Sequence, residues 1–285
     1  MKKITVVGAT NIDIVAKSYN ELKLFDKNPG KAIFSYGGVG RNICENLARL
    51  ELNPTFVTIV GKDEVGKNAM QFLKDLNVNV LAKKSSLPTS TFISILNHES
   101  DSYISISSMD IVDTLDSQFL EKINFDDSEI IVCDANSTKV ANYLGNIKTK
   151  LFVDATSDAK ANKIANILPN INYLKCTKSE METLFKTTDI NNVINTYPNL
   201  NLIVTNKDKP VFFNVGSKVM SKNVTSVNVV SAIGAGDSFS AGIIYGLVNN
   251  YPINKCVDIA IKMSMHSIQQ DTTVSTLLSK KMIGE

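Results

Sequence analysis

The chain has 285 residues, of which 44% are hydrophobic, and its formal net charge at pH 7 is +2. A chain of this length and apolar content can bury a sizeable core, which argues against disorder. The charges are nearly balanced and form no long run of one sign, so a nucleic acid is a poor candidate partner. No stretch of about 18 or more apolar residues is present, so we expect no membrane span.

The cysteines and histidines do not form a recognisable metal-binding or disulfide pattern. Four cysteines lie far apart, at positions 44, 133, 176 and 256, and only two histidines accompany them. Zinc sites and disulfide frameworks need closer or paired spacings. We therefore expect reduced, mostly buried cysteines and a cytoplasmic protein.

Short β-branched runs alternate with helical patterns along the chain. Buried strands are expected at 4–9, 55–61, 129–135, 150–156, 171–176 and 201–206. Apolar residues recur at helical spacing over 41–52, 69–76 and 159–168. This alternation predicts a layered α/β domain in which helices cover both faces of a parallel sheet.

Two regions break this alternation. Residues 11–36 and 90–108 lie outside the βα pattern, and the second reads as two alternating strands joined by a polar turn. They predict a small antiparallel sheet that stands apart from the main one and acts as a lid over a site. Since no linker or repeat divides the chain, we expect residues 1–285 to form one domain with this lid.

The segment 229–248 carries the strongest local motif. Gly234, Ala235 and Gly236 stand where a β-branched run gives way to a helical pattern. Small residues at a helix start let backbone N–H groups approach an anion, and the helix dipole favours negative charge there. Asp237 follows, and two readings stay open from spacing alone. It could cap the helix, or it could accept a hydroxyl proton next to a transferring phosphoryl group.

A second glycine pair opens the helix expected at 41–52. Gly37 and Gly38 suit either a tight turn with positive φ or backbone packed against a polyhydroxylated ligand. Asn42, on the first helical turn, would offer such a ligand a donor and an acceptor. Asn11 and Asp13 follow the first expected strand, where ligand-binding residues commonly lie in α/β folds.

Two familiar nucleotide motifs are not met. Residues 61–68 have the spacing of a P-loop, but Asn68 replaces the magnesium-binding Ser or Thr, and Asp63 and Glu64 bring negative charge. The dinucleotide fingerprint G-x-G-x-x-G also fails at both glycine clusters. A P-loop NTPase and a Rossmann dehydrogenase are therefore disfavoured.

Together, the two glycine-led helices resemble the two signatures of the PfkB, or ribokinase-like, carbohydrate kinase family. The resemblance implies a three-layer α/β sandwich with a mainly parallel sheet and a small β-sheet lid. It also implies ATP, Mg²⁺ and a sugar or nucleoside alcohol as acceptor, and it is compatible with a monovalent cation and a homodimer. Asp237 then matches the catalytic base and Gly234, Ala235 and Gly236 the anion hole, while the substrate's hydroxyls would be held by Asn11, Asp13, Gly37, Gly38 and Asn42.

On the nucleotide side the family's motifs are altered. The residues before the glycines are Ser231 and Ala232 rather than Asp-Thr, and the metal-linked motif reads Thr-Lys-Ser-Glu over 177–180. By position, the resemblance still implies that Glu180 orders magnesium through water. The resemblance also implies ATP contacts from Lys175, Thr177 and Thr205.

Four segments resemble the pseudouridine kinase subgroup more than ribokinases or fructokinases. They are residues 28–50, 108–120, 154–164 and 273–279. The implied reaction is transfer of the ATP γ-phosphoryl group to the 5′-hydroxyl of a C-linked nucleoside. Two alternatives stay open: a sugar kinase of the same family, and a catalytically weak ligand-binding relative.

Overall fold

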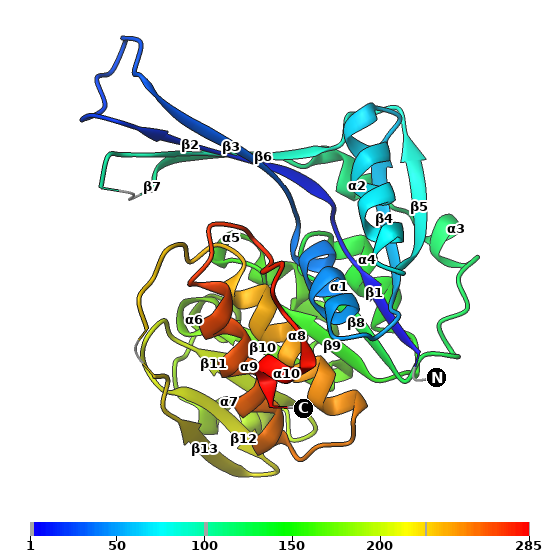
Figure 1. Ribbon diagram of the computed structural model, residues 1–285. Helices are drawn as coiled ribbons and strands as arrows, with labels where there is room; N and C mark the ends of the chain where they lie inside the picture. The colour runs from blue at the N-terminus through cyan, green and yellow to red at the C-terminus, as the bar shows by residue number, and fades with distance from the viewer. Residues whose placement is uncertain (1–2, 100–101, 226, 285) are drawn as a thin grey trace.

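A computed structural model describes residues 3–99, 102–225 and 227–284, and a large, mostly parallel sheet forms its centre (Figure 1). Within these residues the sheet has nine strands in the order β13-β12-β11-β10-β9-β8-β1-β4-β5. The pairings from β11 to β5 are parallel, and β12 and β13 add an antiparallel edge. The strands are β1 Ile4–Val7, β4 Thr55–Gly61, β5 Asn79–Ser85, β8 Ile130–Asp134, β9 Leu151–Asp154, β10 Tyr173–Thr177, β11 Asn201–Thr205, β12 Val211–Val215 and β13 Lys218–Lys222.

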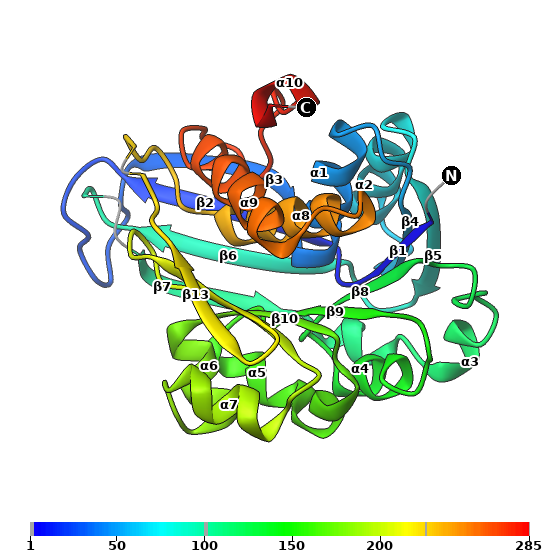
Figure 2. The ribbon, with the colours of Figure 1, turned by 90° about the horizontal axis from the view of Figure 1, so that it is seen from below.

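Helices cover both faces of this sheet, as Figure 2 shows. Alternation along β1 separates the two cores: Ile4 and Val6 pack into one, and Val7 packs into the other. The first core takes α1 Val39–Arg49, α2 Glu64–Asp75, α8 Ala235–Val248, α9 Ile253–Ser267 and α10 Lys280–Ile283. The second takes α3 Ser117–Leu120, α4 Thr138–Leu144, α5 Asp158–Ala161, α6 Lys178–Phe185 and α7 Ile190–Thr196. The predicted three-layer α/β sandwich is confirmed.

One predicted helix is wrong in type. Residues 159–168 form the short α5 followed by a 3-10 helix, η2 Asn162–Asn170, rather than a continuous α-helix. Pro169 lies inside η2; it has no N–H to donate, and it disfavours the α conformation of the residue before it. A second short 3-10 helix, η1 Asp110–Thr114, follows β7.

A second, four-stranded sheet stands apart from the main sheet (Figure 1). Its order is β3-β2-β6-β7, from β2 Asn11–Ser18, β3 Gly30–Gly37, β6 Ser90–Leu96 and β7 Ser102–Ser108. These strands fall within residues 11–37 and 90–108, and the sheet is not wholly antiparallel, because β2 and β6 pair in parallel. β2 follows β1 and β6 follows β5, two parallel strands of the main sheet that β4 separates. Residues 100–101 of the expected polar turn lie outside the described residues.

Across the described helices, none is long and apolar enough to cross a membrane.

The P-loop-like segment serves the fold. Asp63 caps α2, accepting hydrogen bonds from Gly66 N at 2.8 Å and from Thr89 N at 2.7 Å. Its carboxylate therefore stands where a P-loop would hold a phosphate. All four cysteines are free and buried, as the sequence predicts.

Candidate active site

The candidate site lies where the carboxyl ends of the central strands meet the starts of α1, α8 and the second sheet. Asp134 ends β8, Asp154 ends β9 and Thr205 ends β11. Ligands in open α/β sheets bind beyond this edge. Chain topology therefore brings together residues that are more than one hundred positions apart.

Asp237 occupies the first turn of α8, but its side chain does not cap the helix. Gly234 is the N-cap residue, and no side-chain capping bond is formed there. The Asp237 carboxylate instead accepts a hydrogen bond from Asn42 Nδ2 on α1, with 2.7 Å between nitrogen and Oδ2. Of the two readings left open by spacing, capping is therefore wrong.

The surroundings of Asp237 make it a stronger base than an ordinary carboxylate. Desolvation by packed protein and the nearby negative charge of Asp154 raise its pKa to about 7, although Asn42 and Lys175 act in the opposite direction. The residue as a whole is still partly accessible to solvent. A partly accessible carboxyl group with a pKa near neutrality is suited to accept a proton at physiological pH.

Lys175 and Asp154 form a buried ion pair beside this base. Lys175 Nζ lies 3.1 Å from Asp154 Oδ2, which also accepts a 2.6 Å hydrogen bond from Ser240 on α8. Burial alone would lower the pKa of Lys175, but the negative charges of Asp154, Glu180 and Asp237 raise it. The lysine therefore stays charged at the floor of the site.

The lysine also lies against the glycine segment at the start of α8. A Cβ built on Gly236 would be only 3.0 Å from Lys175 Nζ. Gly234 has φ +81°, and a Cβ there would overlap the backbone carbonyl of Thr273. The positive helix end and the lysine charge thus converge on one place, which suits a phosphate.

Replacing Gly234 with alanine is expected to damage both fold and activity, because the new methyl group must displace the Thr273 backbone. Gly216→Ala is the matched control, since Gly216 also has positive φ, +57°, but its Cβ would meet nothing within 4 Å. In Gly216→Ala the free energy of unfolding should fall by only about 1–2 kcal/mol, which is the cost of placing alanine in the left-handed conformation. Urea unfolding of both variants measures the difference; equal losses would show that the Thr273 contact has no effect.

Asn11 and Asp13 lie at the start of β2, two positions apart and so on one face of the strand. The two residues are 8% and 7% exposed, and the Oδ1 atom of each lacks a hydrogen-bond partner among the described residues. Buried acceptors are normally paired, so these two oxygens fit the hydroxyl donors of a ligand. Burial raises the pKa of Asp13 to about 6, and the charge of Arg41 limits the rise.

The glycine pair before α1 brings the backbone close to these residues. Gly38 has φ +101°, which fits the tight turn, one of the two readings that the sequence leaves open for this pair. Gly37 ends β3, and a Cβ there would overlap the carboxylate of Asp13. Asn42 follows, but both ends of its amide already have protein partners, Arg41 and Asp237. Its contact with a substrate hydroxyl stays a prediction.

Thr177 and Glu180 form a capping box at the start of α6. Glu180 Oε2 accepts from Thr177 N at 2.7 Å, and Thr177 Oγ1 accepts from Glu180 N at 3.2 Å. Within the described part of the chain, no cluster of three or more metal-ligating side chains occurs. A magnesium ion that arrives with phosphates keeps several waters and needs few protein ligands, so the single buried Glu180 fits a water-mediated role. Thr205 lies one strand away, hydrogen-bonded to Cys176 O.

Sequence reasoning missed Asp154, Ser240 and Asp134. Asp134 accepts from Ala9 N at 3.0 Å and Gly40 N at 3.3 Å, and so ties the end of β1 to the start of α1. Each missed aspartate lies within two residues of the carboxyl end of an expected strand, 129–135 or 150–156, and this position is close to the one that marked Asn11 and Asp13. Ser240 carried no such signal.

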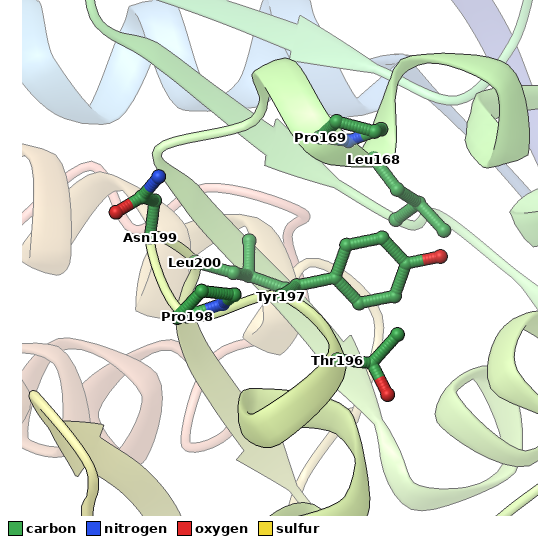
Figure 3. A pocket seen from close by; sticks show the side chains of 7 residues that line it. All are labelled: Leu168, Pro169, Thr196, Tyr197, Pro198, Asn199 and Leu200. Carbon is green, nitrogen blue, oxygen red and sulfur yellow. The ribbon is translucent and has the colours of Figure 1, made fainter.

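A separate pocket lies at the opposite end of β11, away from these groups (Figure 3). It is lined by Leu168 and Pro169 from η2 and by residues 196–200, which precede β11. No charged side chain lines it. This pocket therefore offers none of the chemistry of the candidate site.

The sequence of residues 1–280 matches the pfkB family carbohydrate kinases, and the chain belongs to this family. It is similar to pseudouridine kinase of Escherichia coli strain K12, with 28% identity over 97% of this chain and 93% of that protein. It is also similar to ribokinase of Lactococcus lactis, with 24% identity over 95% and 92% of the two chains. The fold matches the crystal structure of ribokinase from Thermotoga maritima with a TM-score of 0.85, 19% identity and coverage of 100% and 98%. The chain is therefore an ATP-dependent sugar or nucleoside kinase with a ribokinase-like fold.

Proposed function

We propose that this kinase transfers the γ-phosphoryl group of ATP to the 5′-hydroxyl of pseudouridine. The observation that carries the proposal is the hydrogen-bonded Asp237, with a pKa near 7, beside Lys175 and the start of α8. The similarity to a pseudouridine kinase across 97% of the chain supports the choice of acceptor. So do the four segments that resemble this subgroup.

In this proposal the chain's residues act by positioning and proton transfer. Asn11 and Asp13 hold ribose hydroxyls, and Asp237 accepts the proton of the attacking 5′-hydroxyl as its oxygen bonds to the γ-phosphorus. The bond to the β-phosphate oxygen breaks, and ADP leaves. Lys175 and the backbone of 234–236 stabilise the charge that develops on the transferring group. Magnesium, whose waters Glu180 would order, neutralises phosphate charge when bound.

The second sheet is proposed to act as a lid, since β2 carries Asn11 and Asp13 and thereby joins the sheet to the substrate site. Closure over the site would exclude water, which would otherwise compete as acceptor. Four free buried cysteines support the proposal that the enzyme works in the reducing cytoplasm.

A sugar kinase is the second candidate, and the similarity to ribokinase favours it. Asn11 and Asp13 could hold a free sugar as readily as the ribose of a nucleoside. A catalytically weak binding protein has less support. Such a protein would not need a carboxylate of raised pKa held at a phosphate-binding helix end.

A substrate panel separates these candidates. ADP release is measured with ATP, Mg²⁺ and, in turn, pseudouridine, uridine, adenosine, ribose and fructose. We expect kcat/KM for pseudouridine to exceed the others by about tenfold or more, a difference that one or two well-placed hydrogen bonds can produce. Turnover of ribose or fructose but of no nucleoside would support the sugar kinase. Ligand binding without turnover would support the weak binder.

A further inference from the structure

Arg41 is an almost fully buried arginine on the first turn of α1. Its side chain is 2% exposed, and the guanidinium lies 5.7 Å from the ring centroid of Tyr36 and 5.3 Å from that of Phe72. It forms an ion pair with Glu45, but that carboxylate is shared with Arg49, whose Nη2 lies 2.6 Å from Glu45 Oε1. Burying a charge costs free energy unless it is well paired. The placement of Arg41 therefore calls for a reason beyond packing.

Hydrogen bonds lead from Arg41 to the base in two steps. Arg41 Nη1 donates to Asn42 Oδ1 at 2.9 Å, and Asn42 Nδ2 donates to Asp237 Oδ2 at 2.7 Å. Arg41 Nη1 also donates to Tyr36 O at 3.1 Å, which anchors the guanidinium to the end of β3. Arg41 does not itself bond to Asp237; Asn42 is the link.

The chemistry of the two ends selects one orientation of the Asn42 amide. A guanidinium has only donors, and an ionised carboxylate has only acceptors. Rotating the amide by half a turn would place its NH₂ against Arg41 and its oxygen against Asp237, so that both hydrogen bonds would be lost. Arg41 and Asp237 therefore favour the same orientation.

We propose that Arg41 is a positioning residue for Asp237, which acts by fixing the Asn42 amide with its NH₂ group toward the carboxylate. The inference rests on the proposed function, in which Asp237 is the base. A fixed donor favours the ionised carboxylate and holds its second oxygen in one direction. Without Arg41 the Asn42 amide can rotate, and the Asp237 carboxylate then accepts the hydrogen bond from Asn42 for only part of the time.

The charged groups that face Asp237 set its pKa together with the hydrogen bond from Asn42. Lys175 from β10 favours the ionised form, whereas Asp154 from β9 and Asp13 from β2 oppose it. Loss of the Asn42 donor would raise the pKa of Asp237 above its value of about 7. Because the base must be ionised, the acid side of the kcat profile would then move to higher pH.

Arg41→Met tests this, with Arg49→Met as the matched control. Both variants remove one of the two arginines that pair with Glu45, but Arg49 bonds to Glu45 and Thr276 O rather than to Asn42. For Arg41→Met we expect the acid limb, the low-pH side of the kcat profile, to move up by about one pH unit. At pH values below the apparent pKa, kcat is then about tenfold lower than in the wild-type protein. The KM for ATP should stay within about twofold. Arg49→Met should leave the limb in place, and equal shifts in both variants would overturn the proposal.

The Asn42→Ala background tests the route of the effect. Arg41→Met should cause no further shift of the limb there, because the link is already absent. A full additional shift would mean that Arg41 acts by another path, and the proposal would fall. If Arg41→Met does not fold, Arg41→Lys replaces it, and a smaller shift in the same direction is expected, because an ammonium cannot reproduce the guanidinium fork.

An activity-independent measurement separates this inference from the proposed function. In protein labelled with ¹³C-aspartate, the Asp237 carboxyl signal is assigned from its loss in Asp237→Asn and titrated with pH. Arg41→Met should raise the pKa of that signal, and Arg49→Met should not. This result would hold even if the substrate panel gave no turnover. An unchanged Asp237 titration in Arg41→Met would overturn the positioning role whatever the enzyme phosphorylates.

Discussion

Asp237→Asn is expected to lower kcat by about 10²–10⁴-fold, the contribution of a general base, while leaving acceptor affinity nearly unchanged. Asparagine has nearly the same shape as aspartate but cannot accept the hydroxyl proton. The substitution leaves Asn11 and Asp13 unchanged, so the ribose contacts that we propose for these two residues should persist. Coupled ADP release gives kcat, and calorimetric titration gives the Kd of the acceptor.

The pH dependence provides the control for this variant. Wild-type kcat/KM should fall as pH drops through about 7, the folded-state pKa of Asp237, because protonation removes the base. Asp75→Asn, on the exposed surface of α2, should keep both the rate and this profile. An unchanged turnover rate in Asp237→Asn would contradict the assignment of the base.

As the pH rises, the free energy of unfolding of the wild-type protein should fall while its activity increases. The pKa of Asp237 is higher in the folded protein, about 7, than its ordinary value of 3.8. Between these values the folded state holds a proton that the unfolded chain has released, so stability is lost as pH rises through the window. Asparagine has no such loss. Asp237→Asn should therefore be the more stable protein near pH 8, which excludes misfolding as the cause of inactivity.

Lys175→Met has the second large expected effect, and it concerns both stability and catalysis. Removing the lysine leaves Asp154 buried without its cation, and breaking a buried pair in this way costs about 3–5 kcal/mol. The lysine is also lost from the region beside Gly236 that we propose binds the phosphates. We expect kcat to fall by about 10²–10³-fold, as when one stabilising group is removed from a developing charge.

A double variant separates the two effects. In Lys175→Met with Asp154→Asn, the uncompensated charge is gone, so urea unfolding should show most of the lost stability restored, while kcat stays low. Lys3→Met is the control for a surface pair, because Lys3 and Asp127 are 43% and 58% exposed and should contribute less than about 1 kcal/mol. Recovery of activity in the double variant would show that Lys175 matters only for folding.

Local patterns predict the strands, the glycine turns and the glycine-led helices because their causes are local. The β-branched runs at 55–61 and 201–206 become strands buried in the main sheet, and positive φ occurs at Gly38 and Gly234. The pairing of β2 with β6 could not be read in this way. It depends on where β1 and β5 lie in the main sheet.

The contacts that make the site are long-range and have no local pattern. Asn42 and Asp237 are 195 positions apart, and Asp154 meets Ser240 across 86 positions. Thr177 and Glu180 show the opposite case. Their spacing is that of a capping box, but the resemblance drew attention to a metal and left the helix start unnoticed.

We propose that the chain transfers a phosphoryl group to a nucleoside 5′-hydroxyl, and ³¹P NMR of the reaction mixture shows which hydroxyl receives it. Wild-type protein is incubated with ATP, Mg²⁺ and pseudouridine. We expect ADP together with a phosphomonoester signal split by the 5′ methylene protons. Formation of ADP and inorganic phosphate without that ester, or an ester on another hydroxyl, would contradict it.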